Sequence, residues 1–206
     1  MILIAKRLGY VTNLLFLLVF STSSLAQDRS SPSAVVRNFQ VGLLSIMKEA
    51  DRLTVKERYE RLAPLIEGTY QLSDMIRIAS GSSWAQATAD QKDRLRSAFK
   101  RMGVTTLATL FSGYSGESFE IVGERPSTQE TVIIASHIVR PEKSPIVINY
   151  VTRRTGERWY VIDVILDKAI SELKVRQSEY RAVLQKDGIE GLINVLNGKA
   201  DQLVAQ

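Results

Sequence analysis

The chain has 206 residues, no cysteine and a formal net charge of +5, from 27 Lys and Arg against 22 Asp and Glu. The lack of cysteine excludes a disulfide scaffold, a thiolate zinc site and lipidation at a cysteine. The positive surplus is small and dispersed along the chain, unlike the concentrated basic surface of a nucleic-acid-binding protein.

The N-terminal segment has the pattern of a secretory signal peptide. Lys6 and Arg7 precede an uncharged run, and the small residues Ser24 and Ala26 form a cleavage pattern. The run is shorter than the roughly 20 apolar residues that a membrane-spanning helix needs, although an uncleaved anchor helix is the alternative. We therefore expect residues 1–26 to be a signal peptide that is removed after Ala26, which places the protein in a bacterial periplasm.

Residues 27–206 are long enough for one domain with a sizeable core, and their first half predicts helices. A first helix begins near Ser33, with apolar residues at helical spacing: Val36, Phe39, Leu43, Ile46, Met47 and Ala50. A capping box at residues 54–57 opens a second helix, in which Pro64 predicts a kink or an early end. Residues 72–79 predict a third, short helix followed by a turn at 80–83.

A second capping box, at residues 88–91, opens the best-marked helix. Its predicted buried stripe consists of Leu95, Phe99, Met102, Thr106 and Leu110, and Gly113 is the predicted stop. The period then changes to alternation, which predicts an antiparallel meander of four strands near 118–121, 131–139, 145–151 and 158–166. Two further helices follow at 171–186 and 189–204, broken at Asp187 and Gly188.

This order of elements predicts an α+β domain with helices gathered over one face of a curved, four-stranded antiparallel sheet. Both faces of the third strand carry apolar residues, whereas an antiparallel sheet usually has one polar face. Either helices cover both faces, or an apolar cavity between sheet and helices receives a hydrophobic ligand. The candidate lipid-binding residues of such a cavity are Phe99, Met102, Leu110, Phe119, Ile121, Ile146, Ile148, Tyr150, Trp159 and Val161.

Few residues have a pattern that predicts catalysis or metal binding. His137 is the only histidine, and neither a zinc-binding spacing nor a nucleophile motif accompanies it, so we expect no metal, no cofactor and no catalytic residue. Asp163 lies in an apolar strand, where it either pairs with an arginine or a backbone donor near the last helix, or acts as a base. The cations from Arg153 to Arg158 surround one turn and are either solvated or meet an acidic or phosphate partner.

Several segments together resemble a known family. They are residues 58–64, the Trp84 region, residues 111–119, residues 159–167, residues 170–173 and 178–181, and Gly188, Gly191, Leu192, Ile193 and Leu196. In this order they resemble the MlaC-type (toluene-tolerance) family of periplasmic lipid carriers, and within it the hopanoid-associated HpnM branch. The resemblance implies an NTF2-like sheet with helices that enclose a lipid pocket.

The same resemblance implies a non-enzymatic shuttle that carries a hopanoid or a phospholipid between an inner-membrane transporter and the outer membrane. The expected partners are the lipid, that transporter, an outer-membrane acceptor and a transient membrane contact, with the protein itself a monomer. The alternative is a small isomerase or hydrolase on the same scaffold, with Asp163 as its base.

Overall fold

The computed structural model describes residues 30–166 and 170–205, so the predicted signal peptide lies outside the described residues. The helices are α1 (Pro32–Glu49), the short 3-10 helix η1 (Ala50–Arg52), α2 (Val55–Thr69), α3 (Leu72–Ser80), α4 (Ser82–Gln86), α5 (Ala89–Leu110) and α6 (Glu172–Val204). The strands are β1 (Ser118–Pro126), β2 (Thr131–Arg140), β3 (Lys143–Thr155), β4 (Arg158–Leu166) and β5 (Ile170–Ser171). The chain therefore has the predicted α+β character.

Local side-chain signals fix where the helices begin. Both predicted capping boxes are complete: Thr54 and Glu57 bond each other's backbone N–H at the start of α2, and Thr88 and Gln91 do so at the start of α5. At α1, the Ser31 hydroxyl accepts the Ala34 N–H at 3.1 Å. Each of these bonds satisfies a donor that a helix start would otherwise leave unpaired, which explains why these starts can be predicted from sequence.

Glycines account for two turns of the helical chain. Gly188 lies inside α6 with φ 63° and ψ −159°, which confirms the predicted break. Gly81 also has a positive φ, of 57°, as a turn requires, but the predicted turn at 80–83 is only partly right because α4 already begins at Ser82.

The expected effect of Pro64 on helix length is wrong. A proline removes one backbone hydrogen bond from a helix interior. Here α2 nevertheless continues to Thr69. Leu62 and Ile66 on either side are buried at 0% and 4% exposure, and this packing holds the helix together through the proline.

The sheet has five antiparallel strands in the order β1-β2-β3-β4-β5, not the four that the sequence predicts. The additional strand, β5, has two residues, which pair with Ile165 and Leu166 of β4. A two-residue strand is too short to show an alternating pattern, so periodicity could not reveal it. The other four strands form the predicted meander.

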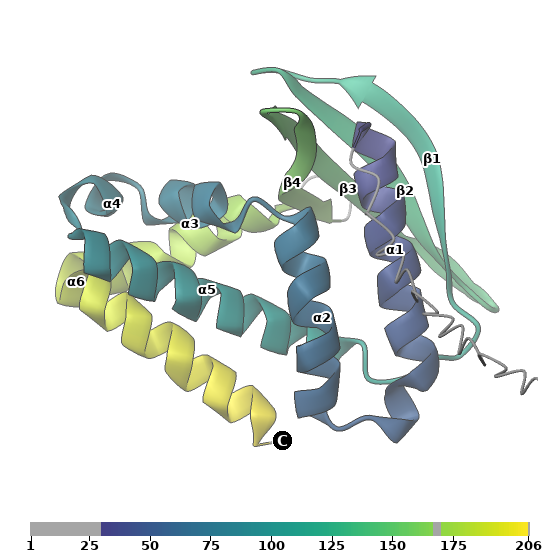
Figure 1. The fold of residues 1–206 in the computed structure, drawn as a ribbon, viewed down its shortest axis with the longest axis horizontal. Coiled ribbons are helices and arrows are strands. Elements are labelled where there is room, and N and C mark those ends of the chain that lie inside the picture. Colours follow the sequence, from purple (N-terminus) through teal and green to yellow (C-terminus); the bar gives the residue numbers. More distant parts are fainter. Residues whose placement is uncertain (1–29, 167–169, 206) are drawn as a thin grey trace, which may run out of the picture.

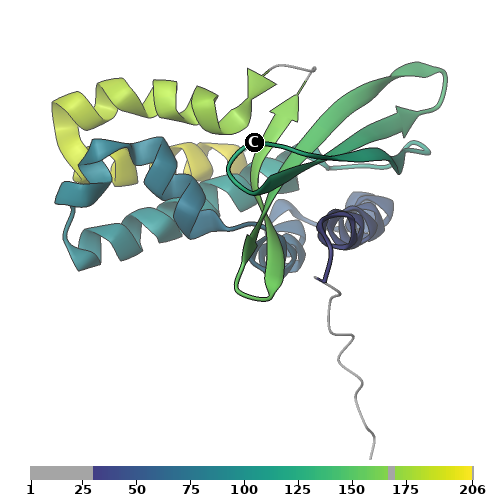
Figure 2. The same ribbon diagram turned by 90° about the horizontal axis from the view of Figure 1, so that it is seen from above.

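Two hydrophobic clusters hold the described residues together. The sheet-side cluster joins α1, α2 and the end of α5 to the sheet, with Val35, Leu43, Leu62, Val104, Ile134 and Val161 among its most buried members. The helix-side cluster joins α3, α5 and α6, with Ile76, Leu95, Leu192 and Leu196 fully or almost fully buried. Figure 1 shows α1 against the sheet and α3 to α6 gathered to one side of it, and Figure 2 shows the same arrangement from above.

Candidate functional site

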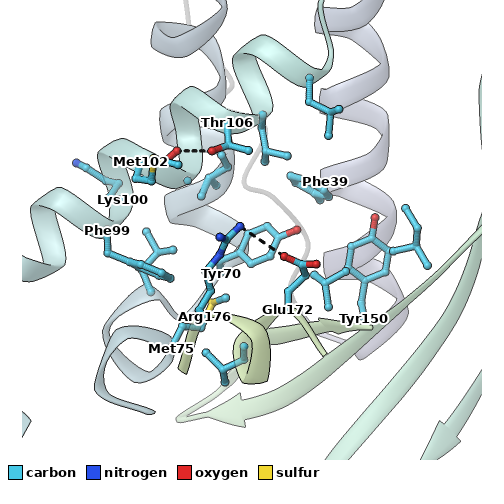
Figure 3. A pocket seen from close by; sticks show the side chains of 18 of the residues that line it. Phe39, Tyr70, Met75, Phe99, Lys100, Met102, Thr106, Tyr150, Glu172 and Arg176 are labelled. Atoms are coloured by element: carbon cyan, nitrogen blue, oxygen red, sulfur yellow. Dashed lines mark hydrogen bonds and ion pairs between the residues drawn. The ribbon is translucent and has the colours of Figure 1, made fainter. Parts of the chain in front are cut away.

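A cavity of about 300 Å³ lies where the two clusters meet. Its wall is formed by Phe39 and Leu43 of α1, Ile66 and Tyr70 at the end of α2, Leu72 and Met75 of α3, a row along α5 from Phe99 to Phe111, Phe119 of β1, Ile148 and Tyr150 of β3, Val164 and Leu166 of β4, and Glu172, Leu173, Arg176 and Tyr180 of α6. Figure 3 shows 18 of these side chains, which converge from the helices and the sheet. The cavity is therefore the hollow between sheet and helices that one of the two sequence interpretations predicts.

Cross-strand pairs build the sheet side of the cavity. Ile148 lies opposite Leu166, and Tyr150 lies opposite Val164. Residues opposite each other on antiparallel strands present their side chains on the same face, so these four form one continuous apolar surface. The aromatic ring of Phe39 from α1 packs edge-on against Tyr150, with ring centroids 6.2 Å apart, and closes one end of this surface.

A β-bulge in β4 decides which of its residues reach the cavity. Thr152 pairs with Val161 but its neighbour Val151 pairs with Asp163, so one additional residue is inserted in β4. The insertion reverses the alternation beyond that point. Val164 and Leu166 therefore line the cavity, and Asp163 lies outside the set of lining residues.

The cavity wall is mostly apolar, and its charged members lie on two helices. Glu172 and Arg176 form an ion pair at 3.6 Å across one turn of α6, and Arg176 also bonds Glu179 at 2.8 Å. Burial raises the pKa of Tyr150 and of Tyr180 to about 12, so both phenols are neutral at physiological pH. Burial also raises the pKa of Tyr70. The interior thus offers apolar surface and neutral phenols, with Lys100, Glu172 and Arg176 as its charged members.

Six of the ten candidate residues line the cavity, namely Phe99, Met102, Leu110, Phe119, Ile148 and Tyr150. Four do not, namely Ile121, Ile146, Trp159 and Val161. Val161 is fully buried because the segment between α2 and α3 covers it, with the Gln71 N–H donating to the Val161 carbonyl at 2.9 Å. That the six residues bind lipid stays a prediction.

The three other candidates that do not line the cavity lie elsewhere on the sheet-side cluster. Ile121 is opposite Ser136, whose hydroxyl accepts a hydrogen bond from Gln40 of α1 at 2.6 Å, so α1 covers this part of the sheet. Ile146 pairs with Ile138, and Trp159 lies near the turn between β3 and β4. All three are partly buried against the sheet-side cluster rather than against the cavity.

The predicted buried stripe of α5 is buried only in part, and Leu110 is its exposed end. The sequence places it on a buried stripe, but its side chain is 68% exposed, so that expectation is wrong. It lies at the end of the helix and forms part of the cavity rim. Leu95 and Phe99 of the same stripe are buried, whereas Met102 and Thr106 are half-buried because they face the hollow instead of packed side chains.

Sequence reasoning missed most of the helical wall. The missed residues are Phe39, Leu43, Ile66, Tyr70, Leu72, Met75, Lys100, Gly103, Thr106, Leu107, Phe111, Val164, Leu166, Glu172, Leu173, Arg176 and Tyr180. Phe39, Leu43 and Ile66 carry a signal, since they lie on apolar helix stripes, but a stripe does not tell packed core from cavity wall. Nothing in the sequence indicates that the charged residues Lys100, Glu172 and Arg176 reach this cavity.

Asp163 is bound to the start of the last helix. One oxygen of its carboxylate accepts the Val164 N–H at 2.8 Å and the Leu173 N–H at 3.0 Å, and the other accepts the Ser171 hydroxyl at 2.6 Å. The sequence left open whether Asp163 pairs with an arginine or with a backbone donor near the last helix, and the structure shows backbone donors. Ser171 in turn caps α6 by accepting the Lys174 N–H, so the carboxylate secures the junction between β4 and α6.

The remaining chemical candidates lie apart from the cavity. His137 lies on β2, between β1 and β3, opposite Glu120 and Val147. Arg153, one of the cations at the β3–β4 turn, forms an ion pair with Asp74 of α3. Arg154 is exposed and donates to the Gly156 carbonyl at 3.1 Å. Within residues 30–166 and 170–205, no group of three potential ligands could hold a metal ion.

Comparison with known proteins identifies the family. Residues 38–198 match the family model described as MlaC protein. The chain belongs to the MlaC family. Among curated proteins, none matches this MlaC-family chain in sequence. No helix within the described part of the chain is both long and apolar enough to cross a bilayer.

One solved structure shows that the fold is shared. It is a phospholipid-binding protein from Ralstonia solanacearum in complex with a phospholipid, and it matches this MlaC-family chain with a TM-score of 0.74 at 19% sequence identity. The match covers 84% of this chain and 98% of that one. The likeness therefore extends over nearly the whole described fold.

Proposed function

We propose that this protein is a lipid carrier that works in the periplasm. The signal-peptide pattern before Gln27 supports export, and membership of the MlaC family supports lipid binding. The structural relative from Ralstonia solanacearum, described as phospholipid-binding, supports a phospholipid as cargo. The NTF2-like assignment, the HpnM branch with a hopanoid as cargo, and the partners in the inner and outer membranes belong to the same proposal and rest on the resemblance in sequence.

The observation that carries the proposal is the apolar cavity between the two clusters. A lipid that leaves a bilayer exposes its chains to water, which costs about 25 cal/mol per Å² of apolar surface. A carrier offsets this cost only if it supplies an apolar enclosure, and the walls from Phe39, Phe99, Ile148 and Leu166 supply one. No observation favours the isomerase or hydrolase alternative, because the oxygens of Asp163 are held by Ser171 and by backbone N–H groups.

The decisive experiment extracts and identifies lipid from protein purified from its native compartment. We expect mass spectrometry to find a phospholipid or a hopanoid bound to the wild-type protein. Gly103 lines the cavity at an exposed position of α5, and a Cβ added there meets no atom within 4 Å, so Gly103→Phe places a ring at the cavity mouth without a clash at its base. This variant should stay folded and lose most of its lipid.

Gly198→Phe is the matched control. Gly198 also lies in a helix and also has open space around its added Cβ, but it does not line the cavity. Its lipid content should equal that of the wild type. Equal lipid content in the two variants, both folded, would place the ligand elsewhere and refute the proposal.

Export has its own test. N-terminal sequencing of the native protein should give a first residue of Gln27 in a soluble periplasmic fraction. A chain that keeps Lys6 and Arg7 and stays in the membrane fraction would be an anchored protein rather than a shuttle.

A further inference from the structure

A second, polar pocket of about 240 Å³ adjoins the apolar cavity. The two share Tyr70, Leu72 and Lys100, so their walls are continuous. The residues found only in the polar pocket are Glu67, Gln71, Ser73, Arg96 and Ser97. Hydroxyl, amide, guanidinium, ammonium and carboxylate groups thus meet beside a cavity that is mostly apolar.

Two cations face this pocket from one side of α5. Arg96 and Lys100 are four residues apart, which places them on the same helix face. Figure 3 shows the Lys100 ammonium turned away from the apolar side chains, and it pairs there with Glu67. The hydrogen bond with Glu67 raises the pKa of Lys100, so the ammonium is charged at physiological pH. Only one of its three N–H donors is needed for that bond.

Arg96 has hydrogen-bonding capacity that the protein itself does not use. One terminal nitrogen donates to Asp93 at 2.7 Å, but its Nε is buried and has no partner among the described residues. A buried donor without a partner is unfavourable by an amount comparable to a lost hydrogen bond. An acceptor in the pocket would remove that deficit.

The start of α3 adds backbone donors to the same pocket. Its N-cap residue Gln71 makes no side-chain capping bond, and Leu72 and Ser73, the first residues of this nine-residue helix, line the pocket. The first N–H groups of a helix attract anions. The acidic residue of this first turn, Asp74, is already paired with Arg77 and Arg153.

We propose that the polar pocket binds the phosphate of a lipid headgroup while the acyl chains occupy the adjoining cavity. The two cations, the unpartnered Nε of Arg96, the serine hydroxyls and the start of α3 are the donors that a phosphate accepts. This inference rests on the proposed lipid-carrier function and narrows it to a lipid with a phosphate next to its apolar part. An uncharged triterpenoid would leave these donors without an acceptor.

The test compares two lipids that differ only in the phosphate. Delipidated protein is titrated with a phosphatidic acid and with the diacylglycerol of the same chains. We expect the wild type to bind phosphatidic acid at least about tenfold more tightly, since hydrogen bonds to charged groups are the stronger kind. Arg96→Gln should lose most of this preference while its affinity for diacylglycerol stays unchanged.

Two further variants protect the test from folding effects. Arg101→Gln is the matched control, because Arg101 lies on α5 and is paired with Asp201 but lines neither pocket. It should keep the preference. Ser73→Asp adds a carboxylate to the pocket in the first turn of α3, where an acidic residue stabilises a helix. It should therefore stay folded, bind diacylglycerol normally and lose phosphatidic acid.

Each outcome decides one question. Equal affinity of the wild type for both lipids, or an equal loss of both in Arg96→Gln, overturns the headgroup inference and leaves the carrier intact. If the wild type binds neither lipid, a phospholipid as cargo fails together with the headgroup inference, and the lipid extraction proposed above decides whether a hopanoid carrier remains. Inorganic phosphate should compete only weakly with phosphatidic acid; if it binds alone as tightly, and Arg96→Gln abolishes this binding, the pocket is a site for free phosphate instead.

Discussion

The two hydrophobic clusters both bury apolar side chains, but they do so with different elements. In the sheet-side cluster, a sheet face is covered by α1 and α2, and residues such as Leu62 and Ile134 are fully buried. In the helix-side cluster, three helices pack on one another without the sheet, and Leu95 and Leu192 are equally buried. The cavity lies at their junction and takes wall residues from both.

The comparison shows where a hollow can persist in a well-packed protein. Each cluster is close-packed because its elements can approach until their side chains meet. At the junction, α5 belongs to both clusters and cannot move toward one without leaving the other, so Met102 and Thr106 face unfilled space. A ligand that fills this space would join the two clusters into one core.

The largest expected effect is a difference in the free energy of unfolding that is lost when a leucine is shortened in the packed core or on the cavity wall. Leu62→Ala in the sheet-side cluster and Leu192→Ala in the helix-side cluster should each lower the free energy of unfolding by about 2–5 kcal/mol, because each side chain is fully buried and leaves a new void. Leu166→Ala, on the cavity wall, should cost only about 1 kcal/mol, because its side chain is partly buried beside existing space.

Urea unfolding of the delipidated protein measures all three values. Each core variant should also unfold in a single transition, since cooperative unfolding would lose both clusters together. If the wall variant cost as much as the core variants, the hollow would be closed by side-chain rearrangement in solution. Two separate transitions would mean that the clusters unfold independently.

Lipid removal should weaken the link between the clusters. A ligand that binds only the folded state adds about 2.7 kcal/mol of stability at a free concentration of 100 times its Kd. We therefore expect delipidation to lower the melting temperature of the wild type and to speed amide exchange in both α5 and α6. Gly103→Phe should show little change on delipidation, and Gly198→Phe should behave as the wild type.

The sequence predicts helix starts and strand order well because their causes are local. The capping boxes at Thr54 and Thr88 and the break at Gly188 each depend on a few neighbouring residues. By the same reasoning, β5 could not be predicted, because two residues carry no pattern. Packing on both sides of Pro64 likewise overrides a local expectation that the helix would end there.

The cavity is harder to predict because it depends on how distant elements meet. Alternation assigns Val161 to its wall, but the segment between α2 and α3 covers Val161. The bulge after Val161 places Val164 and Leu166 on the cavity side of β4. Arg176 and Tyr180 line the cavity only because the first half of α6, which leaves the sheet after β5, runs beside α3 and α5. Such residues have no distinguishing sequence signal, since an apolar stripe looks the same against a core and against a cavity.

A smaller effect concerns the junction between β4 and the helix-side cluster. Asp163→Asn keeps the shape of the side chain but removes its negative charge. It also replaces one of the two carboxylate oxygens, which together accept hydrogen bonds from the Ser171 hydroxyl and from the Val164 and Leu173 N–H groups. We expect a loss of about 1.5–3 kcal/mol in unfolding free energy, the range for hydrogen bonds to a charged group. Lipid affinity of the folded protein should not change.

Ser171→Ala is the comparison for that variant. It removes one of the three bonds and the cap of α6, so it should cost about 1 kcal/mol, less than Asp163→Asn. A stable Asp163→Asn protein that binds lipid and accumulates an unprocessed substrate would instead revive the enzymatic alternative.

The smallest expected effect is a pH dependence of the free energy of unfolding, and it comes from an ion pair between α5 and α6 in the helix-side cluster. Glu190 of α6 bonds Arg94 and Gln91 of α5, and the hydrogen bond with Arg94 is the main reason that the pKa of Glu190 lies below its ordinary value of 4.5. A lowered carboxyl pKa contributes stability at pH values above 4.5, and this contribution is lost as the pH falls through the folded-state pKa. Both side chains are well exposed, so salt should weaken the effect.

The measurement is urea unfolding of wild type and Glu190→Gln from neutral to acidic pH. The difference between them should be largest at neutral pH and should vanish in acid. Glu57→Gln is the comparison on the sheet-side cluster, where the pKa of Glu57 is lowered mainly by its backbone hydrogen bond with Thr54. Because the pKa of Glu57 is lowered as well, Glu57→Gln should show the same direction of pH dependence, with its loss at neutral pH kept small because glutamine can serve in a capping box, as Gln91 does. A pH-independent difference for Glu190→Gln would show that the contact of α5 with α6 does not depend on this charge.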